Sequence, residues 1–488
     1  MNFYFEAANI LDRLDAKQGS IKGLIATVPE KNRKRTAALV IETLKYKAVL
    51  TDIIEAATLL KEERKITTKN LALVLVHDLL LANGGIQAGD GPVKQAVLRH
   101  KTRLNSEFQR IKIKLGVKTT KELARSQDER AGKIPRYVRV NTACWNTEDA
   151  VRSFISRGYV LSGPFDHPKG FAKDAHIPDL LLFPPDTQFV EISFYREGKI
   201  ILQDKASCFP AFILAPPAEK GTVAIDATAA PGNKTSHLAA LMKNKGKVFA
   251  FERDRKRYAT LQTMLSRAKC ENVEAVNADF LTISPDDPKY SAVTHILLDP
   301  SCSGSGIVNR LDHLLESDGA DRYLIAIESE SLEDEEERLH KLASFQLMMI
   351  RHAMKFPAVK RIVYSTCSVH AIENENVVKE ALKTEECNAG PFRLAPRNMV
   401  LPTWPRRGLP EEMDSPDEAA SLVRCSPGDD ATNGFFVCLF MRVTGSPGSE
   451  PSPSTKRTHE ADGLELDRPS RPSKKRKKKR KKDTQSES

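Results

Sequence analysis

Five short apolar runs, separated by segments that can form helices or loops, constrain the fold of residues 201–443 more than any other feature of the chain. The runs are rich in β-branched residues, and most of them lack the polar alternation of a strand that faces water on one side. Strands of this kind, divided by helices, form a parallel sheet that is covered on both faces. The sequence therefore predicts an α/β domain over 201–443, with GFFVCLFMRV (434–443) as a further strand at its edge. The five runs are TVAIDAT (222–228), KVFAFER (247–253), VEAVNADF (273–280), VTHILLDP (293–300) and RIVYSTCS (361–368).

Residues 1–130 show a different pattern, with apolar residues at helical spacing and with lysines and arginines on the opposite faces. The clearest example is the set Leu50, Ile53, Ile54 and Ala57. The most apolar window, LALVLVHDLLLA (71–82), is too short to cross a bilayer and contains two polar residues. We therefore expect a helical N-terminal region with 71–82 as a buried helix, and no membrane association.

Residues 131–200 contain short β-branched runs broken by prolines, which predict a small α+β module. In PRYVRVNT, the arginines Arg136 and Arg139 flank Tyr137. Arginine can contact phosphate and tyrosine can stack on a base, so the module could bind RNA. Ordinary surface arginines beside a strand remain an equally good interpretation of the same residues.

The charge of the chain is concentrated near its C-terminus. The formal net charge is +11, but nine positive charges form the run KKRKKKRKK (474–482), so the other 479 residues carry about +2. Residues 444–488 are rich in proline, serine and charge, which predicts a disordered basic tail. Such a run favours delivery to the nucleus, and to the nucleolus in particular, with attraction to nucleic acid as a second effect.

The N-terminus and the cysteines bear on the compartment and on metal binding. The first 20 residues have charges scattered among their apolar positions, so no secretory signal is expected. Eight cysteines occur without CxxC pairs or nearby histidines at ligand spacing, so we expect no metal site and reduced thiols. The sequence indicates no oligomeric state.

Polar residues follow the predicted strands where a parallel sheet binds its ligands. In IDATAAPGNKT the chain leaves the first strand at Asp226, turns through small residues and begins a helix at Lys234, whose free N–H groups favour an anion. Glu252 stands 20 residues after Gly232, the spacing of an acid that binds ribose, and Asp279 could accept from an adenine amino group. The turn matches neither GxGxxG nor a P-loop, which favours S-adenosylmethionine over a pyrophosphate.

Two cysteines follow the fourth and fifth strands, in DPSCSGSG (299–306) and YSTCS (364–368). If those strands are adjacent, Cys302 and Cys367 both overhang the cofactor pocket, with Asp299 beside them. A single cysteine is usually an inert buried side chain, but two at a ligand edge favour covalent activation of an electron-poor ring. Thiolate addition to cytosine C6, assisted by an acid at N3, makes C5 nucleophilic enough to accept a methyl group.

These segments resemble a known family. IDATAAPGNKT, FERDRKR, DPSCSGSG and YSTCS are similar to the successive motifs of the Sun-domain (Fmu type) RNA cytosine-5 methyltransferases. QDKASCFPAFIL (203–214), PRYVRVNT and NGFF also match family segments, so the resemblance spans about 130–443. The spelling of DPSCSGSG and the order of the motifs are most similar to one branch of this family, that of its fifth human member, which acts on large-subunit ribosomal RNA. The resemblance implies a Rossmann-like S-adenosylmethionine-dependent methyltransferase domain.

The resemblance also assigns roles. Cys367 would be the nucleophile, Cys302 would assist product release, and Asp299 would contact the cytosine and lie close to the cofactor. The expected product is 5-methylcytosine in RNA, most specifically in large-subunit (28S) ribosomal RNA. The alternatives are a catalytically silent RNA-binding factor in ribosome assembly, and the same chemistry on tRNA. The residues expected to hold S-adenosylmethionine are Thr228, Ala229, Ala230, Pro231, Gly232, Asn233, Lys234, Glu252, Arg257, Asp279 and Asp299.

Three departures from the family pattern stand out. Thr228 and Asn233 replace a cysteine and a glycine of the usual CAAPGGKT, and the usual APCSG is PSCSG here. The segment 315–338 is longer and more acidic than expected, and its end, SESLEDEEER, should point outward as the solvated start of a helix.

Overall fold

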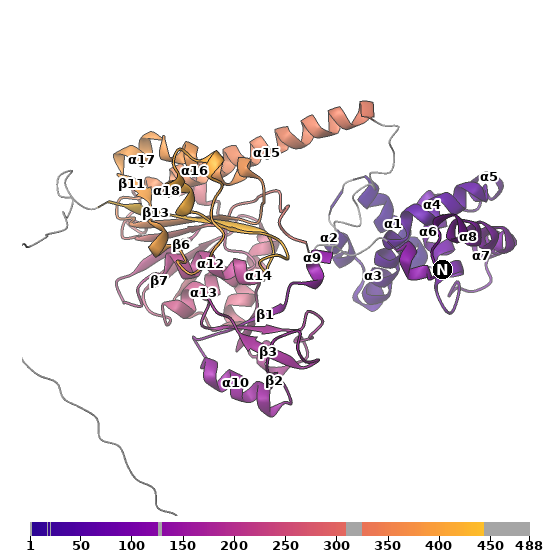
Figure 1. The fold of residues 1–488 in the computed structure, drawn as a ribbon, viewed down its shortest axis with the longest axis horizontal. Coiled ribbons are helices and arrows are strands. Elements are labelled where there is room, and N and C mark those ends of the chain that lie inside the picture. The colour runs from indigo at the N-terminus through magenta and orange to yellow at the C-terminus, as the bar shows by residue number, and fades with distance from the viewer. Residues whose placement is uncertain (1, 17, 20, 125–128, 309–324, 444–488) are drawn as a thin grey trace, which may run out of the picture. The chain divides into compact units, whose positions relative to one another are not determined.

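The computed structural model describes residues 2–16, 18–19, 21–124, 129–308 and 325–443, with backbone only for 22, 121, 129 and 325–335. The five predicted runs form strands of one sheet, and each pairs in parallel with its neighbours among the five. The sheet order is β11-β13-β10-β9-β6-β7-β8, and helices lie on both of its faces (Figure 1). The α/β prediction is therefore confirmed. The five strands are β6 (Val223–Asp226), β7 (Lys247–Phe251), β8 (Val273–Val276), β9 (His295–Leu298) and β10 (Arg361–Thr366).

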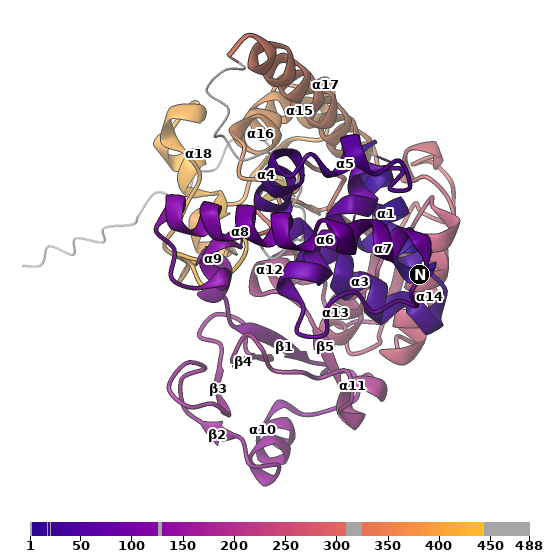
Figure 2. The ribbon, with the colours of Figure 1, turned by 90° about the vertical axis from the view of Figure 1, so that its right-hand side faces the viewer.

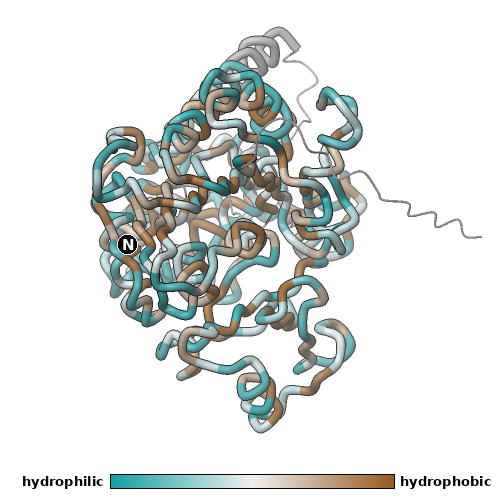
Figure 3. Tube along the Cα trace, turned by 90° about the vertical axis from the view of Figure 1, so that its left-hand side faces the viewer, coloured by the Kyte–Doolittle hydropathy of each residue, from teal (hydrophilic) through white to brown (hydrophobic). Residues whose placement is uncertain are grey.

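Alternate residues of each central strand enter two different cores. In β9, Ile296 and Leu298 pack into the core beneath α15 (Ile325–Met354) and α16 (Glu375–Leu382). The residue between them, Leu297, packs with α12 (Lys205–Leu214) and α13 (Asn233–Leu241) on the opposite face. Because both faces are apolar, the strands read as continuous hydrophobic runs in the sequence. Figure 3 colours the backbone trace by hydropathy, with hydrophobic stretches in brown. The chain also forms α14 (Arg255–Arg267) beside β8.

The strand predicted at the edge is not at the edge. β13 (Phe435–Arg442) pairs antiparallel with β10 on one side, while β11 (Phe392–Leu394) and β12 (Val423–Cys425) pair with its other side. Two strands of three residues each are too short to be recognised as runs in the sequence. The edge prediction for 434–443 was therefore wrong.

The segment after residue 131 forms a second, five-stranded sheet with the order β2-β3-β4-β1-β5 and one main helix, α10 (Thr147–Ser156) (Figure 2). We call it the α+β module. Val138 and Val140 of β1 point into its own core around Phe154. Its strands are β1 (Arg136–Val140), β2 (Val160–Leu161), β3 (Gly170–Lys173), β4 (Leu180–Phe183) and β5 (Ile200–Leu202), with the short helices α9 (Glu129–Gly132) and α11 (Ser193–Arg196).

The opposite face of β1 turns toward the α/β domain, and this corrects the expected RNA contacts. Tyr137 is buried and donates a hydrogen bond to the carbonyl of Ala431 (2.6 Å). Arg139 is only 1% exposed. Neither residue can stack on a base or contact phosphate, and neither is an ordinary surface residue, whereas Arg136 is exposed. The expected RNA contacts are therefore wrong for Tyr137 and Arg139, and the interpretation as a surface arginine is wrong for Arg139.

The N-terminal residues form helices around a core of their own, as predicted. Leu71 to Val76 of α6 are all buried, and Leu50, Ile53, Ile54 and Ala57 lie in the same core. Among the described residues, no helix combines the length and the apolarity that crossing a bilayer requires. The helices are α1 (Asn2–Asp15), α2 (Ile21–Ala26), α3 (Glu30–Lys45), α4 (Lys47–Ala56), α5 (Leu59–Glu62), α6 (Lys69–Leu81), α7 (Pro92–Arg99) and α8 (Lys101–Leu115).

Two predictions concern segments of which the structure describes little or nothing. SESLEDEEER lies in the first turns of α15, so it is helical as expected, but most of its side chains lie outside the described residues. The tail expected to be disordered, 444–488, also lies outside them. The remaining helix bounds are α17 (Glu385–Ala389) and α18 (Pro416–Ala420).

The core of the α+β module yields a stability prediction. Phe154 is 0% exposed and its ring contacts five other aromatic rings, those of Tyr159, Phe171, Phe183, Phe189 and Phe194. Phe154→Ala should lower the free energy of unfolding of the module by about 3–5 kcal/mol, because it leaves a cavity. Hydrogen exchange of peptides covering β1, measured by mass spectrometry on the intact protein, reports this value. The neighbouring Ile155 is 48% exposed, so Ile155→Ala is the control and should change it by less than about 0.5 kcal/mol. Equal effects of the two variants would contradict the assigned core.

Candidate active site

The turn between β6 and α13 is built on a buried carboxylate. Asp226 is 1% exposed and its Oδ2 accepts a hydrogen bond from Thr235 Oγ1 (2.7 Å), while its Oδ1 accepts from Thr228 N (3.4 Å). Burial raises the pKa of Asp226 to about 6. Gly232, which caps α13, has φ +112°, and a Cβ there would lie 3.2 Å from Leu261. A side chain would strain this turn, which explains a glycine at the position.

A cavity of about 490 Å³ lies where β6 to β10 end. Its volume falls in the range of roughly 300–1,000 Å³ typical of small-ligand sites. Of the predicted residues, Thr228, Glu252, Arg257, Asp279, Asp299, Cys302 and Cys367 line it. The predicted stretch from Ala229 to Lys234 forms the turn and helix start beside the cavity and does not line it. In particular, the Asn233 amide donates to the carbonyl of Leu202 (3.4 Å) in the α+β module.

The two acids at the ends of β7 and β8 keep oxygen atoms available to a ligand. Glu252 Oε1 accepts from Asp254 N (2.9 Å), and Oε2 lies 3.4 Å from Arg257 Nη2. Arg257 also donates to the carbonyl of Ala230 (2.8 Å), which links this acid to the turn. Asp279 Oδ1 accepts from Leu281 N (3.0 Å), and its Oδ2 lies 3.4 Å from Arg253 Nη1. Each carboxylate has lone pairs left for the hydroxyl or amino groups of a nucleoside, so the cavity fits S-adenosylmethionine.

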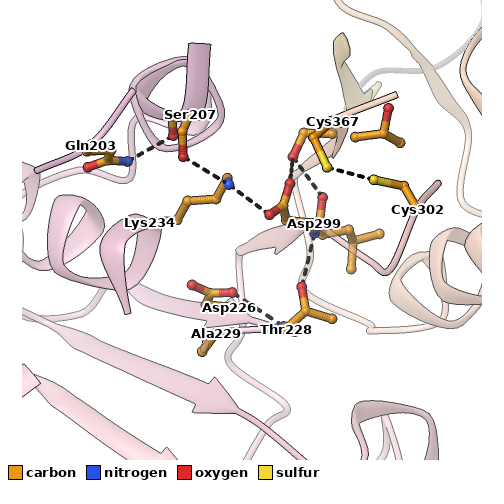
Figure 4. A network of polar contacts seen from close by, with 12 residues as sticks. Gln203, Ser207, Asp226, Thr228, Ala229, Lys234, Asp299, Cys302 and Cys367 are labelled. Carbon is orange, nitrogen blue, oxygen red and sulfur yellow. Dashed lines mark hydrogen bonds and ion pairs between the residues drawn. The ribbon is translucent and has the colours of Figure 1, made fainter. Parts of the chain in front are cut away.

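Asp299 is held from three sides (Figure 4). Its Oδ2 forms an ion pair with Lys234 Nζ (2.7 Å), and its Oδ1 accepts from Ser365 Oγ (2.7 Å). Its backbone N donates to Thr228 Oγ1 (3.2 Å). Burial alone lowers the pKa of Lys234, but the Asp299 carboxylate outweighs this effect and raises it above the ordinary value. Lys234 therefore carries its proton next to a carboxylate that faces the cavity.

The two cysteines face each other across the wall of the same cavity. Cys302 Sγ and Cys367 Sγ are 2.8 Å apart, as adjacent parallel strands predict (Figure 4). The hydrogen bond with Cys367, together with burial, raises the pKa of the Cys302 thiol far above its ordinary value. Cys302 therefore holds its proton at neutral pH and can donate it toward the sulfur of Cys367.

Residues that the sequence did not single out fix the two cysteine loops. Glu373 is fully buried and accepts from both the backbone N (2.9 Å) and the hydroxyl (2.5 Å) of Ser303. Gln346 of α15 donates to the carbonyl of Ser301 and to Glu373 (both 3.0 Å). The only sequence signal for Glu373 is its place in IENEN, directly after YSTCSVHA. An acid there reads as a surface residue unless its partners are known.

Two glycines allow the loop of Cys302 to reach its position. Gly306 N donates to the carbonyl of Cys367 (2.9 Å), and Gly306 accepts from Gly434 N (2.7 Å). A Cβ on Gly434 would lie 2.8 Å from the Cα of Gly306, which is closer than real Cβ atoms approach other atoms. The NGFF segment therefore packs backbone to backbone against the loop of Cys302.

Family models match three consecutive parts of the chain. Residues 34–124 match the N-terminal domain of NOL1/NOP2/Sun domain family member 5, and residues 134–203 match the ferredoxin-like domain of the same member. Residues 211–441 match the 16S rRNA methyltransferase RsmB/F family. The first two matches are to one member of the family, and the third covers the domain that holds the cavity.

Curated relatives cover most of the chain. The 25S rRNA (cytosine-C(5))-methyltransferase rcm1 of Schizosaccharomyces pombe is 45% identical over 90% of this chain and 90% of its own length. The 28S rRNA (cytosine-C(5))-methyltransferase of Mus musculus is 44% identical over 93% and 94%. The crystal structure of PH0851 matches with a TM-score of 0.57 and 20% identity, over 89% of this chain and 97% of that chain, which shows a shared fold. This chain therefore belongs to the NOL1/NOP2/Sun domain family, in its member 5 group, and is an S-adenosylmethionine-dependent RNA (cytosine-5)-methyltransferase.

Proposed function

We propose that this enzyme methylates C5 of a cytosine in large-subunit ribosomal RNA, with Cys367 as the nucleophile. The observation that carries the mechanism is the pair of thiols, 2.8 Å apart, beside Asp299 in the wall of one cavity. The substrate class follows the two relatives named above, which are 44–45% identical and are named for 25S and 28S ribosomal RNA.

S-adenosylmethionine supplies the methyl group when it is bound in this cavity. We assign its binding to Thr228, Glu252, Arg257 and Asp279, which line the cavity at the ends of β6, β7 and β8. Glu252 suits the ribose hydroxyls and Asp279 suits the adenine amino group, since both are acceptors at strand ends. The turn from Ala229 to Lys234 shapes the wall next to them.

The cytosine is activated by the other side of the cavity. The Cys367 sulfur bonds to C6, N3 takes up a proton, and the electron pair of the C5–C6 double bond becomes available at C5. Asp299, whose charge is held by Lys234 and Ser365, is placed to direct the proton to N3. The Lys234–Asp299 ion pair thus provides both the negative charge that orients the base and a source of the proton.

Cys302 takes part in release. After methylation, the C6–S bond breaks and the proton on C5 must leave. A base, which can be solvent water, removes the C5 proton as the C5–C6 double bond re-forms. The Cys302 thiol donates its proton to the departing sulfur of Cys367 and regains it afterwards from that thiol, while N3 returns its proton to the Lys234–Asp299 pair. This balances the protons of the reaction, with one released to solvent. The 2.8 Å separation of the sulfur atoms and the raised pKa of Cys302 both support this role.

The target base must be single-stranded or flipped out of its helix, because a stacked base cannot present C5 and C6 to opposite sides of a pocket. Arg136 is exposed on the α+β module and remains a candidate for contact with the flanking strand. The basic run 474–482 supports action in the nucleus, specifically the nucleolus, and a part in ribosome biogenesis.

Cysteine variants test the division of labour. Cys302→Ala should accumulate a covalent protein–RNA adduct, because the sulfur of Cys367 still attacks but leaves slowly. Cys367→Ala should form none. Denaturing gel electrophoresis after incubation with RNA and S-adenosylmethionine separates the adduct. Cys270→Ala, which removes a half-buried thiol away from the cavity, is the matched control and should behave as the wild type. The opposite pattern would make Cys302 the nucleophile.

The substrate is tested in cells. Bisulfite mapping of 5-methylcytosine with and without the protein should show one or more cytosines of large-subunit ribosomal RNA that lose the modification. Restoring the wild type should restore it, and restoring Cys367→Ala should not. Loss confined to tRNA would replace the substrate, and no change in any RNA would leave the assembly-factor alternative.

A further inference from the structure

The side chain of Arg139 enters the boundary between the α+β module and the α/β domain. It comes from β1 of the module and is 1% exposed. Its Nε donates to Gln203 Oε1 (2.7 Å), and its Nη2 donates to Ser236 Oγ (2.9 Å) and to the carbonyl of Asn233 (3.3 Å). The guanidinium group thus binds the first turn of α13, the helix that carries Lys234.

Two sets of contacts connect Arg139 to Lys234. The first is the backbone, because the carbonyl that Arg139 binds belongs to Asn233, the residue before Lys234. The second is a chain of side chains, which Figure 4 shows from Gln203 onward. Gln203 Nε2 donates to the carbonyl of Ser207 (2.9 Å), and Lys234 Nζ donates to the Ser207 hydroxyl (3.2 Å). Arg139 therefore restrains the lysine at its backbone and at a partner of its ammonium group.

The ammonium group has little freedom to find another position. Its contacts are Asp299 Oδ2 (2.7 Å), the Ser207 hydroxyl and the ring of Phe435, whose centroid is 5.3 Å away. If α13 or Ser207 moved, the ammonium group would move as well, and its distance to Asp299 would increase. Asp299 would then lose the charge that holds its carboxylate toward the cavity.

Stability alone does not account for an arginine at this position. The hydrogen-bond partners of Arg139 among the described residues are uncharged, namely Gln203, Ser236 and the carbonyl of Asn233, and its Nη1 has no partner there. A buried charge without a counter-ion is costly, and an apolar side chain of similar volume would fill the space at lower cost. The hydrogen bonds that Arg139 does make go to the first turn of α13, which carries Lys234, and to Gln203, which binds Ser207, a partner of the Lys234 ammonium group.

We propose that Arg139 is a positioning residue, which holds Lys234 against Asp299 and so links the seating of the α+β module to the catalytic centre. The proposal rests on the proposed function only in that the Lys234–Asp299 pair acts on the cytosine. It requires no contact between Arg139 and RNA.

Arg139→Met in the intact protein tests the proposal, since methionine keeps much of the volume without the hydrogen bonds. We expect kcat to fall about tenfold or more, with KM for the RNA within about twofold of the wild type. The loss should not add to that of Lys234→Met, because both changes remove the same interaction. The alkaline limb of the pH profile of kcat should move to lower pH, since a displaced Lys234 loses the neighbour that raises its pKa.

Asn141→Ala is the matched control. Asn141 is equally buried on the same segment, and its amide donates to the carbonyls of Gly198 (2.9 Å) and Ala268 (2.8 Å), so it also fixes the module without touching Lys234. This variant should lose stability but keep the pH profile and kcat within about twofold. An equal fall of kcat in both variants, or a loss in Arg139→Met that adds to that of Lys234→Met, would overturn the proposal.

A crystal structure of Arg139→Met tests the same point without activity. The distance between Lys234 Nζ and Asp299 Oδ2 should exceed hydrogen-bonding range in the variant, and an unchanged ion pair would overturn the proposal. Wild-type protein that transfers no methyl group to any cytosine would instead refute the proposed function, and the crystallographic result would still decide the role of Arg139.

Discussion

The parallel pairing of β9 with β10 is the constraint on which the site depends. Leu298 lies opposite Tyr364, so the residues that follow, Asp299 and Ser365, emerge side by side and share a hydrogen bond of 2.7 Å. The two cysteine loops continue from these positions. Strands 66 residues apart in sequence thus deliver an acid and two thiols to one wall of a cavity, and no other register would do so.

The polar groups behind this wall form a frame that is completed before any substrate arrives. Glu373 and Gln346 hold the loop of Cys302 from the side of α15. The Tyr364 hydroxyl lies between them, 2.5 Å from the carbonyl oxygen of Glu373, to which it donates, and 3.0 Å from Gln346 Oε1. Groups that are already oriented need no reorganisation as charge develops in the reaction. On the other side of the thiols, the ion pair with Lys234 holds the Asp299 carboxylate in place before the reaction begins. The thiols lie between two preformed networks.

Much of this arrangement could be predicted, because the carboxyl ends of parallel strands always meet at one edge. The positions of Glu252, Asp279, Asp299 and both cysteines around one cavity follow from strand order alone. The roles of Tyr137 and Arg139 could not be predicted from the sequence. Alternation along a strand shows that the strand has two faces, but it does not show which face packs against another domain. Glu373 was missed for a related reason: a carboxylate is expected in water unless the donors that satisfy it, here from Ser303, are known.

The contact between Gly306 and Gly434 joins two backbones with no side-chain atoms between them. Any residue larger than glycine at either place would push apart the terminal strand and the loop that carries Cys302. The spacing of the sulfur atoms would widen with it. The mutational tolerance of the segment that leads into β13 is thereby tied to the reactivity of a thiol more than a hundred residues earlier, and a single added methyl group should silence the chemistry while leaving the sheet intact.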